Sequence, residues 1–303
     1  MNNYYWPVYL NLERDFLKLA EYVHIDDYQL DVYSVKIADM LIRTVVEIES
    51  IAKALYFNNG GVKADDNNLH FDRDCFGFLD PLWELGKKEI LVVSPSLYLE
   101  KKNKTIHPLK HCSKSGSSAP VWARAYQAVK HNRIKELQRG NIWNLLLALG
   151  ALYILNLYYS DETYEYIDEG KVIISNLSFG SQLFSTLKPY TGVSLHEPIN
   201  SGEYCKKLIY LAVPIGGLYD IVAQMGRDIQ KDIAKQIQEE FVQGYKEGKF
   251  ENISELEINS LIDSHWKEVS NQSRYRARWI KMGTKMSKIS YELKLNKNHN
   301  NVS

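Results

Sequence analysis

The longest apolar run of the chain, residues 145–159, is the feature that most constrains its fold. A helix that is apolar on every side has to be surrounded by the rest of the protein or by lipid. The run is too short to span a bilayer comfortably, and it contains the polar Asn156. We therefore expect a buried core helix over residues 142–159 and no membrane association.

A second core helix is expected over residues 34–57, because apolar residues recur there at the spacing of a helix face. Asparagine and glycine at residues 58–61 tolerate the left-handed turn that ends helices. The other expected elements are a helix over residues 12–23 capped by Asn11, an extended stretch over 90–99, a helix over 120–139, a β-hairpin over 171–187, a broken helix over 208–223, and helices over 228–249 and 254–293.

This pattern predicts a mainly α-helical protein, a helical bundle with a small β-hairpin insertion and additional C-terminal helices. We expect the bundle to occupy residues 1–160 and the β element with the C-terminal helices to occupy residues 161–295. Residues 296–303 are expected to form a disordered tail.

Composition limits the classes of function. The 303 residues include 37 Lys and Arg against 37 Asp and Glu, so the net charge is zero and any attraction to nucleic acid has to be local. The three cysteines, Cys75, Cys112 and Cys205, are widely spaced and odd in number, which argues against a disulfide framework and for a reducing compartment. The N-terminus lacks the regions of a signal peptide. A cytoplasmic protein is therefore expected.

One helical segment, Trp-Ala-Arg-Ala-Tyr-Gln-Ala-Val-Lys-His-Asn-Arg at residues 122–133, concentrates chemically useful side chains. Seven residues make about two helical turns, so Arg124 and His131 are expected on one face, about 20° apart. The residues that project to the same side are Gln127, Ala128 and Lys135. Those that project to the opposite side, toward the core, are Trp122, Ala125, Tyr126 and Val129.

Arginine and histidine on one accessible face point to phosphate chemistry. A guanidinium holds phosphate through paired hydrogen bonds, and an imidazole takes up or releases a proton near neutral pH. These are the side chains that a metal-free nuclease needs most. The alternative is a solvated face on which His131 only caps the helix or hydrogen-bonds to a neighbour.

The segment resembles the motif of the HEPN superfamily, in which an arginine is followed by four to six residues and then a histidine in a compact helical bundle. Here the interval from Arg124 to His131 is six residues. An acid-bearing core helix precedes the motif, and Asn-Ile-Trp-Asn-Leu-Leu-Leu-Ala-Leu follows it at residues 141–149. The resemblance covers about residues 10–160 and implies a HEPN-like bundle there.

HEPN-type ribonucleases are typically metal-independent, pair two motifs across a dimer and serve in prokaryotic toxin and antiphage systems. The resemblance therefore implies an endoribonuclease without a cofactor, acting on RNA as a homodimer, with an antitoxin or another defence-system protein as a further partner. Arg124 would clamp the phosphate and His131 would transfer protons while the 2′-hydroxyl of RNA attacks. Because one histidine cannot easily serve as base and acid at once, two chains are expected to meet at one site.

Two other functions remain open at this point. One is an inactive relative that binds RNA, a nucleotide or a protein through the same fold. The other is a structural or regulatory helical protein in which Arg124 and His131 hold helices together.

Basic residues of the motif helix are expected to assist Arg124. Lys130, Arg133 and Lys135 would add phosphate contacts, and Gln127 shares the face of the motif. Arg133 lies nearly opposite Arg124 on the helix, so a structural ion pair is an equally good expectation for it.

Two acids, Glu47 and Glu49, lie on the preceding core helix. A carboxylate from either residue would hydrogen-bond to Arg124 or His131 and so orient that side chain. Otherwise they face solvent or a buried arginine such as Arg43.

A second basic segment lies near the C-terminus. Its cationic residues, which interleave with Tyr275 and Trp279, are Arg274, Arg276, Arg278 and Lys281. A helix of this composition can bind RNA through contacts to phosphates and stacking on bases. The alternative is an ordinary surface helix whose aromatic residues enter the core while its arginines pair with acids.

Other catalytic and metal-binding patterns are discounted. His107, His111 and Cys112, with Cys75 farther away, do not make a zinc motif, because Pro108 spoils the helical geometry and paired Cys-x-x-Cys is absent. The sequence contains neither a P-loop nor a serine or cysteine nucleophile motif.

Overall fold

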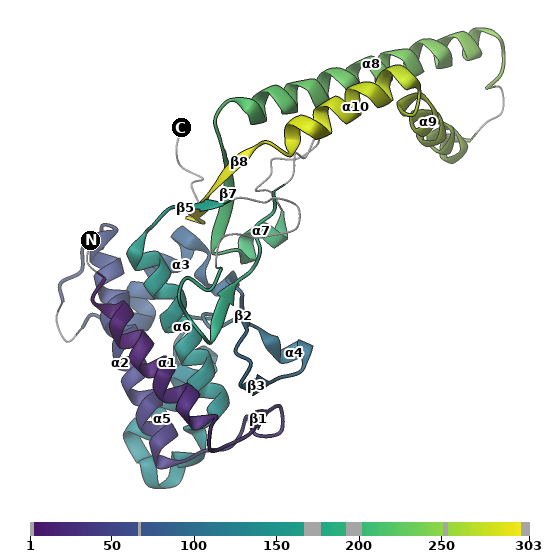
Figure 1. The fold of residues 1–303 in the computed structure, drawn as a ribbon. Coiled ribbons are helices and arrows are strands. Elements are labelled where there is room, and N and C mark those ends of the chain that lie inside the picture. Colours follow the sequence, from purple (N-terminus) through teal and green to yellow (C-terminus); the bar gives the residue numbers. More distant parts are fainter. Residues whose placement is uncertain (1–2, 66–67, 167–176, 192–201, 251–253, 298–303) are drawn as a thin grey trace.

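The computed structural model of the chain describes residues 3–65, 68–166, 177–191, 202–250 and 254–297. It has a helical body from which a long helical arm projects (Figure 1). The helices that build most of the body are α1 (Tyr5–Leu19), α2 (Val35–Asn58), α5 (Val121–Glu136) and α6 (Ile142–Ser160). The mainly α-helical class expected from the sequence is confirmed.

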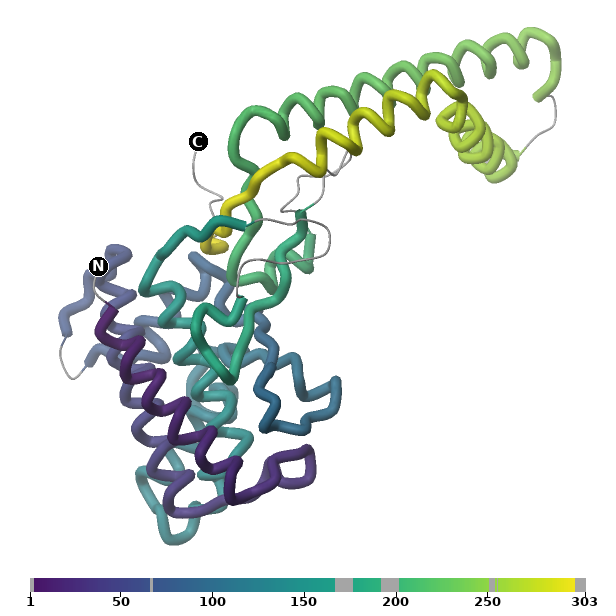
Figure 2. Tube along the Cα trace, viewed as in Figure 1, coloured from purple at the N-terminus to yellow at the C-terminus, as the bar shows by residue number. Residues whose placement is uncertain are grey.

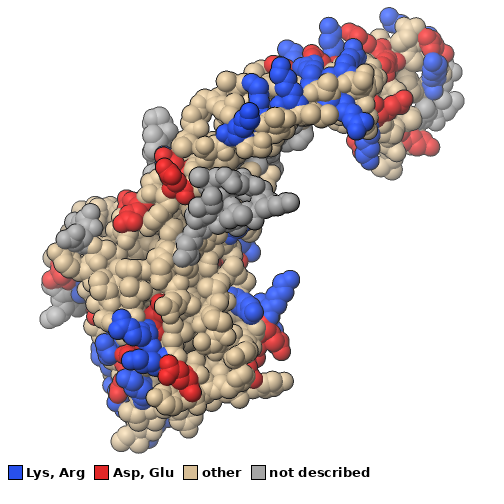
Figure 3. Space-filling model, in the orientation of Figure 1, with Lys and Arg blue, Asp and Glu red and all other residues tan. Residues whose placement is uncertain are grey.

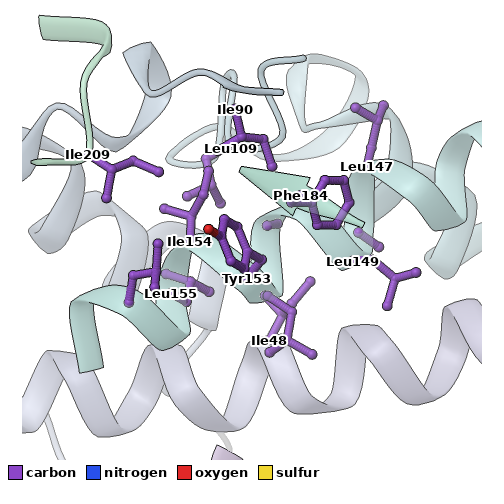
Figure 4. Close-up of a cluster of buried hydrophobic side chains, with 14 of the residues drawn as sticks. Ile48, Ile90, Leu109, Leu147, Leu149, Tyr153, Ile154, Leu155, Phe184 and Ile209 are labelled. Carbon is purple, nitrogen blue, oxygen red and sulfur yellow. The ribbon is translucent and has the colours of Figure 1, made fainter. Parts of the chain in front are cut away.

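Helix α6 lies at the centre of the body, as its apolar sequence predicts. Almost all of its side chains are buried, because α2 packs along it and α1 and α5 also contact it. Figure 4 shows Tyr153 and Ile154 between Ile48 of α2 and Ile90 on the opposite side. By length and hydropathy α6 could cross a membrane, but 83% of its apolar window is buried inside the protein, which is typical of the core helix of a soluble protein.

Polar side chains satisfy backbone N–H groups at the starts of α1 and α2. Ser34 caps α2 by accepting a hydrogen bond from the Ile37 N–H at 3.1 Å, in agreement with the predicted start. Helix α1 starts earlier than predicted, at Tyr5, and the side chain of Asn3, just before the N-cap residue Tyr4, accepts hydrogen bonds from its first turn. Asn3 Oδ1 accepts a hydrogen bond from the Tyr5 N–H at 3.0 Å. The pattern of apolar residues does not distinguish between two such asparagines.

Short elements fill the connections between the body helices. They are a π-helix (Phe71–Phe76), α3 (Gly77–Trp83), α4 (Lys101–Lys104), 3₁₀ turns (Leu85–Lys87, Gly116–Ser118, Leu137–Arg139), β1 (Ile25–Asp26), β2 (Ile90–Val92), β3 (Leu97–Tyr98) and β4 (Thr105–Ile106). Strand β1 pairs in parallel with β3, while β2 lies between β4 and β6 (Phe184–Thr186) in an antiparallel sheet. The stretch expected to be extended over residues 90–99 contains two of these strands.

Part of the chain after residue 160 packs into the core of the body. Strand β6 falls in the second half of the expected hairpin but pairs with β2, with Phe184 opposite Val92. Most of the first half of that hairpin, residues 171–176, lies outside the described residues. Buried side chains from both sides of residue 160, including Tyr158 and Tyr210, share one core. Packing therefore continues across residue 160.

Two strands occupy positions where helices were expected. Strand β7 (Tyr210–Ile215) follows the short helix α7 (Glu203–Lys207), and β8 (Ser290–Leu295) replaces the end of the helix expected over residues 254–293. In one antiparallel sheet β8 lies between β7 and β5 (Tyr164–Tyr166). A short apolar run suits a buried helix or a strand, and here the deciding strand partner is far away in the sequence. Pro214 is tolerated because β7 is an edge strand.

The arm is inserted in the chain between β7 and β8 (Figure 2). Helix α8 (Leu218–Lys246) leads outward, α9 (Glu255–Ser270) lies near the far end, and α10 (Ser273–Met286) leads back to the body. The arm has a small core of its own, whose buried residues are Ile229, Ile233, Ile237, Val269 and Tyr275. The helical character expected for most of this region is confirmed.

Asn296 and Lys297 are ordered, although the sequence places them in a disordered tail. The buried side-chain amide of Asn296 donates to the carbonyl oxygen of Cys205 at 2.7 Å, and the Asn296 carbonyl accepts from the Tyr158 hydroxyl at 2.9 Å. Lys297 Nζ lies 2.6 Å from Asp161 Oδ2. These contacts hold the end of β8, and with it the base of the arm, against the body. Residues 298–303 lie outside the described residues.

Gly150→Ala is expected to lower the free energy of unfolding by about 1–3 kcal/mol, because Pro108 and Ile90 lie too close to this part of α6 to leave room for a methyl group. A Cβ at Gly150 would lie 2.8 Å from Pro108 Cγ and 3.0 Å from Ile90 Cδ1. Urea denaturation measures the loss. The control is Gly77→Ala in α3, where a Cβ meets nothing within 4 Å and stability should change by less than about 1 kcal/mol. Equal stability of the two variants would contradict the tight packing.

Candidate functional site on helix α5

Helix α5 presents the motif as the sequence predicts. Its buried residues, which face the core, are Trp122, Ala123, Ala125, Tyr126 and Val129. Trp122 also anchors the start of the helix, since its indole N–H donates to the carbonyl oxygen of Pro108 at 2.8 Å. The other face, with Arg124, Gln127 and His131, is exposed.

Arg124 and His131 are both available to a ligand. Neither side chain forms a hydrogen bond or ion pair with any residue that the structure describes. The backbone between them is regular helix, and the interruption comes directly after His131, at Asn132, with φ −148° and ψ 71°. The two side chains therefore share a face of α5, as predicted.

The basic residues around the motif have different roles. Lys130 Nζ lies 5.3 Å from the centre of an aromatic ring of its own helix. Arg133 lies 2.7 Å from Asp39 Oδ1, so the structural ion pair is the expectation that holds for it. Lys135 follows the interruption at Asn132, and the helical projection that placed it beside Arg124 no longer applies. Gln127 stays on the exposed face.

The two acids of α2 are not brought to the motif. Glu49 Oε1 lies 3.8 Å from Lys53 Nζ, one turn along the same helix. Glu47 is half-buried, and the structure gives neither acid a hydrogen bond or ion pair with Arg124 or His131. Direct orientation of the motif by these carboxylates is therefore not seen.

A cavity of about 490 Å³ lies at the N-terminal end of α5. The basic and imidazole side chains that line it are Lys102, His107, Lys110, His111 and Arg124. Within the described part of the chain, its lining contains no Asp or Glu. Arg124 therefore belongs both to this cavity and to the motif face, whereas His131 lies outside the cavity. Lys102 Nζ lies 2.9 Å from Glu100 Oε2, which is outside the lining. A lining with cations and no acid favours an anionic ligand such as phosphate.

A buried carboxylate, that of Glu89, holds one of the cavity histidines. Strands β2 and β4 pair with Ile90 opposite Ile106, so the flanking Glu89 and His107 lie side by side. Glu89 Oε1 lies 2.7 Å from His107 Nε2 and 2.8 Å from Lys207 Nζ. These contacts fix the orientation of the imidazole ring. Sequence reasoning missed Glu89, because only the strand register brings it to His107.

The thiols of Cys75 and Cys112 are poorly suited to bind metal. Burial raises the pKa of the Cys75 thiol to about 12 and also raises that of Cys112, so both stay protonated. Among the residues with described coordinates, no group of three or more His, Cys, Asp or Glu side chains is placed to hold a metal ion.

The basic segment of the arm is partly paired. Figure 3 shows Lys and Arg side chains gathered along the arm. Helix α10 carries five of them and no acid. Arg274 hydrogen-bonds to Gln236, and Arg278 Nη1 lies 2.6 Å from Asp232 Oδ2. The Arg276 side chain is exposed and forms no hydrogen bond or ion pair with the residues that the structure describes. The alternative expectation, a surface helix whose arginines pair with neighbours and whose Tyr275 enters the core, therefore holds in part, and RNA binding by this helix stays a prediction.

No family model, curated protein or solved structure matches this chain. Its chemistry is therefore inferred from the side chains themselves. The exposed pair on α5 and the basic cavity next to it form the candidate site, and Arg124 is the residue common to both.

Proposed function

We propose that the protein is a metal-independent endoribonuclease of the HEPN type. The observation that carries the proposal is the pair Arg124 and His131, exposed on one regular stretch of α5 and free of partners among the described residues. A buried aromatic face holds that stretch rigidly on the core. A guanidinium and an imidazole on one exposed helix face suit phosphodiester cleavage.

The reaction uses the nucleophile that RNA itself supplies. The 2′-oxygen attacks the adjacent phosphorus and loses its proton, the bond from phosphorus to the 5′-oxygen breaks, and the 5′-oxygen gains a proton. The products carry a 2′,3′-cyclic phosphate and a 5′-hydroxyl. Arg124 stabilises the charge that develops on the phosphate, and His131 transfers a proton.

The proposed role in defence rests on the HEPN resemblance alone, which implies a homodimer that acts on RNA in an antiphage-defence or toxin–antitoxin system. The proposed cytoplasmic location rests on the cysteine content of the sequence. An antitoxin or another defence protein would restrain the enzyme. On the arm, Arg276 would add a phosphate contact, and Arg274 and Arg278 would support it.

One observation favours a second candidate, an inactive module that binds RNA, a nucleotide or a protein. The cavity gathers three cationic side chains, Lys102, Lys110 and Arg124, but not His131. Such a cavity can bind a phosphate without cleaving it. The two candidates differ in whether the bound RNA is cut.

Purified protein is expected to cut RNA in the presence of EDTA, because both proposed groups are side chains and not metal ions. The assay follows an end-labelled RNA and identifies 2′,3′-cyclic phosphate and 5′-hydroxyl ends. The control RNA has a single 2′-deoxynucleotide at the mapped site and should resist cleavage there. Binding without cleavage would support the inactive module, and cleavage that EDTA abolishes would overturn the proposal.

A further inference from the structure

Cleavage by the 2′-hydroxyl needs two proton transfers, and the motif face of α5 supplies only one histidine. The attacking hydroxyl loses a proton while the leaving 5′-oxygen gains one. A second proton-transfer group therefore has to come from a partner chain or from another part of this chain.

Arg124 connects the motif face with a second imidazole. On α5 it shares a face with His131, and it also lines the cavity that contains His107. A phosphate held by the Arg124 guanidinium would meet His131 from the helix and His107 from the cavity. Lys110 lines the same cavity and would stabilise the added negative charge, together with Lys102, whose Nζ also lies 2.9 Å from Glu100 Oε2.

The ring of His107 is held in a way that suits a base. Its Nε2 lies 2.7 Å from the buried carboxylate of Glu89. A carboxylate only accepts hydrogen bonds, so Nε2 carries the hydrogen and Nδ1 of the neutral ring keeps a free lone pair. His111 also lines the cavity, but no carboxylate among the described residues orients its ring. His107 is thus the oriented imidazole of the cavity.

We propose that His107 is the general base of this site, that Glu89 is the positioning residue that orients it, and that His131 is the general acid. This proposal rests on the ribonuclease function proposed above. Nδ1 of neutral His107 takes the proton of the 2′-hydroxyl as the bond from the 2′-oxygen to phosphorus forms. The bond to the 5′-oxygen breaks, and the imidazolium of His131 gives its proton to that oxygen. Both transfers take place within one chain.

The roles are tested with RNA that carries sulfur in place of the 5′-oxygen at the mapped cleavage site, since a thiolate leaves without needing a proton. His131→Gln is expected to lower kcat on ordinary RNA by about 10²–10⁴-fold and to recover most of that loss on the sulfur substrate. For His107→Gln, kcat is expected to fall by a similar factor on both substrates. The plot of kcat against pH should be bell-shaped for the parent and lose its acidic limb in His107→Gln.

Glu89→Gln tests the positioning role. It keeps the size of the side chain but removes the carboxylate that fixes the ring, so kcat should fall about 10-fold or more while KM for RNA stays within about 3-fold. Its acidic limb should also shift along the pH axis, which a purely structural role would not cause. Melting temperatures of all variants show whether the fold is retained.

The matched control is His24→Gln, a surface histidine that lies 3.8 Å from Asp26 and outside the cavity. It should cleave RNA as the parent does. The assignment of the base would be overturned if His107→Gln cleaved RNA at the parental rate. It would also be overturned if the sulfur substrate restored the activity of His107→Gln. Either result would leave the ribonuclease function intact. Restored cleavage in mixtures of inactive Arg124→Ala and His131→Ala chains would show that two chains share one site and would also overturn the assignment. A parent that does not cut RNA would overturn both proposals.

Discussion

Arg124→Ala and His131→Ala are each expected to lower kcat for RNA cleavage by about 10²–10⁴-fold while the melting temperature stays at the parental value. A fixed cation that stabilises transition-state charge and an imidazole that transfers a proton each contribute an effect of that size. Stability should not change, because both side chains are exposed and have no partner among the described residues. Initial rates on the mapped RNA and thermal unfolding measure the two quantities.

Two neighbouring substitutions serve as controls for that result. Gln127→Ala removes an exposed side chain from the same face and should cost less than about 10-fold in kcat. Arg133→Ala breaks the ion pair with Asp39 and should change stability by less than about 1 kcal/mol. If Arg124→Ala or His131→Ala instead lowers the melting temperature by several degrees, the structural role of the pair is the correct one.

Glu13→Ala is expected to lower the free energy of unfolding by about 3–5 kcal/mol, because it removes the acceptor at the centre of a buried network. Glu13 of α1 is buried, and its carboxylate accepts from the Tyr9 hydroxyl at 2.7 Å and from the Leu183 N–H at 3.0 Å. Ser181 also donates to it. Burial and the charge of Glu13 raise the pKa of Tyr9, so that hydroxyl keeps its proton and remains a donor. Urea denaturation measures the loss.

The network matters for the fold because it ties α1 to the segment that leads into β6. Without the carboxylate, buried donors from both elements lose their acceptor. The control is Arg14→Ala on the next residue of α1, which is exposed and should change stability by less than about 0.5 kcal/mol. Tyr9→Phe removes one donor and should cost about 1 kcal/mol. A loss below 1 kcal/mol in Glu13→Ala would contradict the importance of the network.

The motif on α5 could be predicted from local sequence, but the pairing of Glu89 with His107 could not. The spacing of Arg124 and His131 within one helix places them on one face, and the apolar residues between them determine that this face points outward. The pair Glu89 and His107 depends on the register of β2 and β4. Local sequence patterns do not show which strands pair, so they do not identify the carboxylate that orients the cavity histidine.

The same division applies to the fold. The apolar composition of α6 and the Ser34 cap of α2 are local, and the sequence by itself determined both elements. Only the tertiary structure decided that residues 210–215 form a strand, because their partner β8 arrives from the end of the chain after the arm has returned. Helix hydrogen bonds close within one segment, whereas a strand is stable only when a distant segment satisfies its backbone groups.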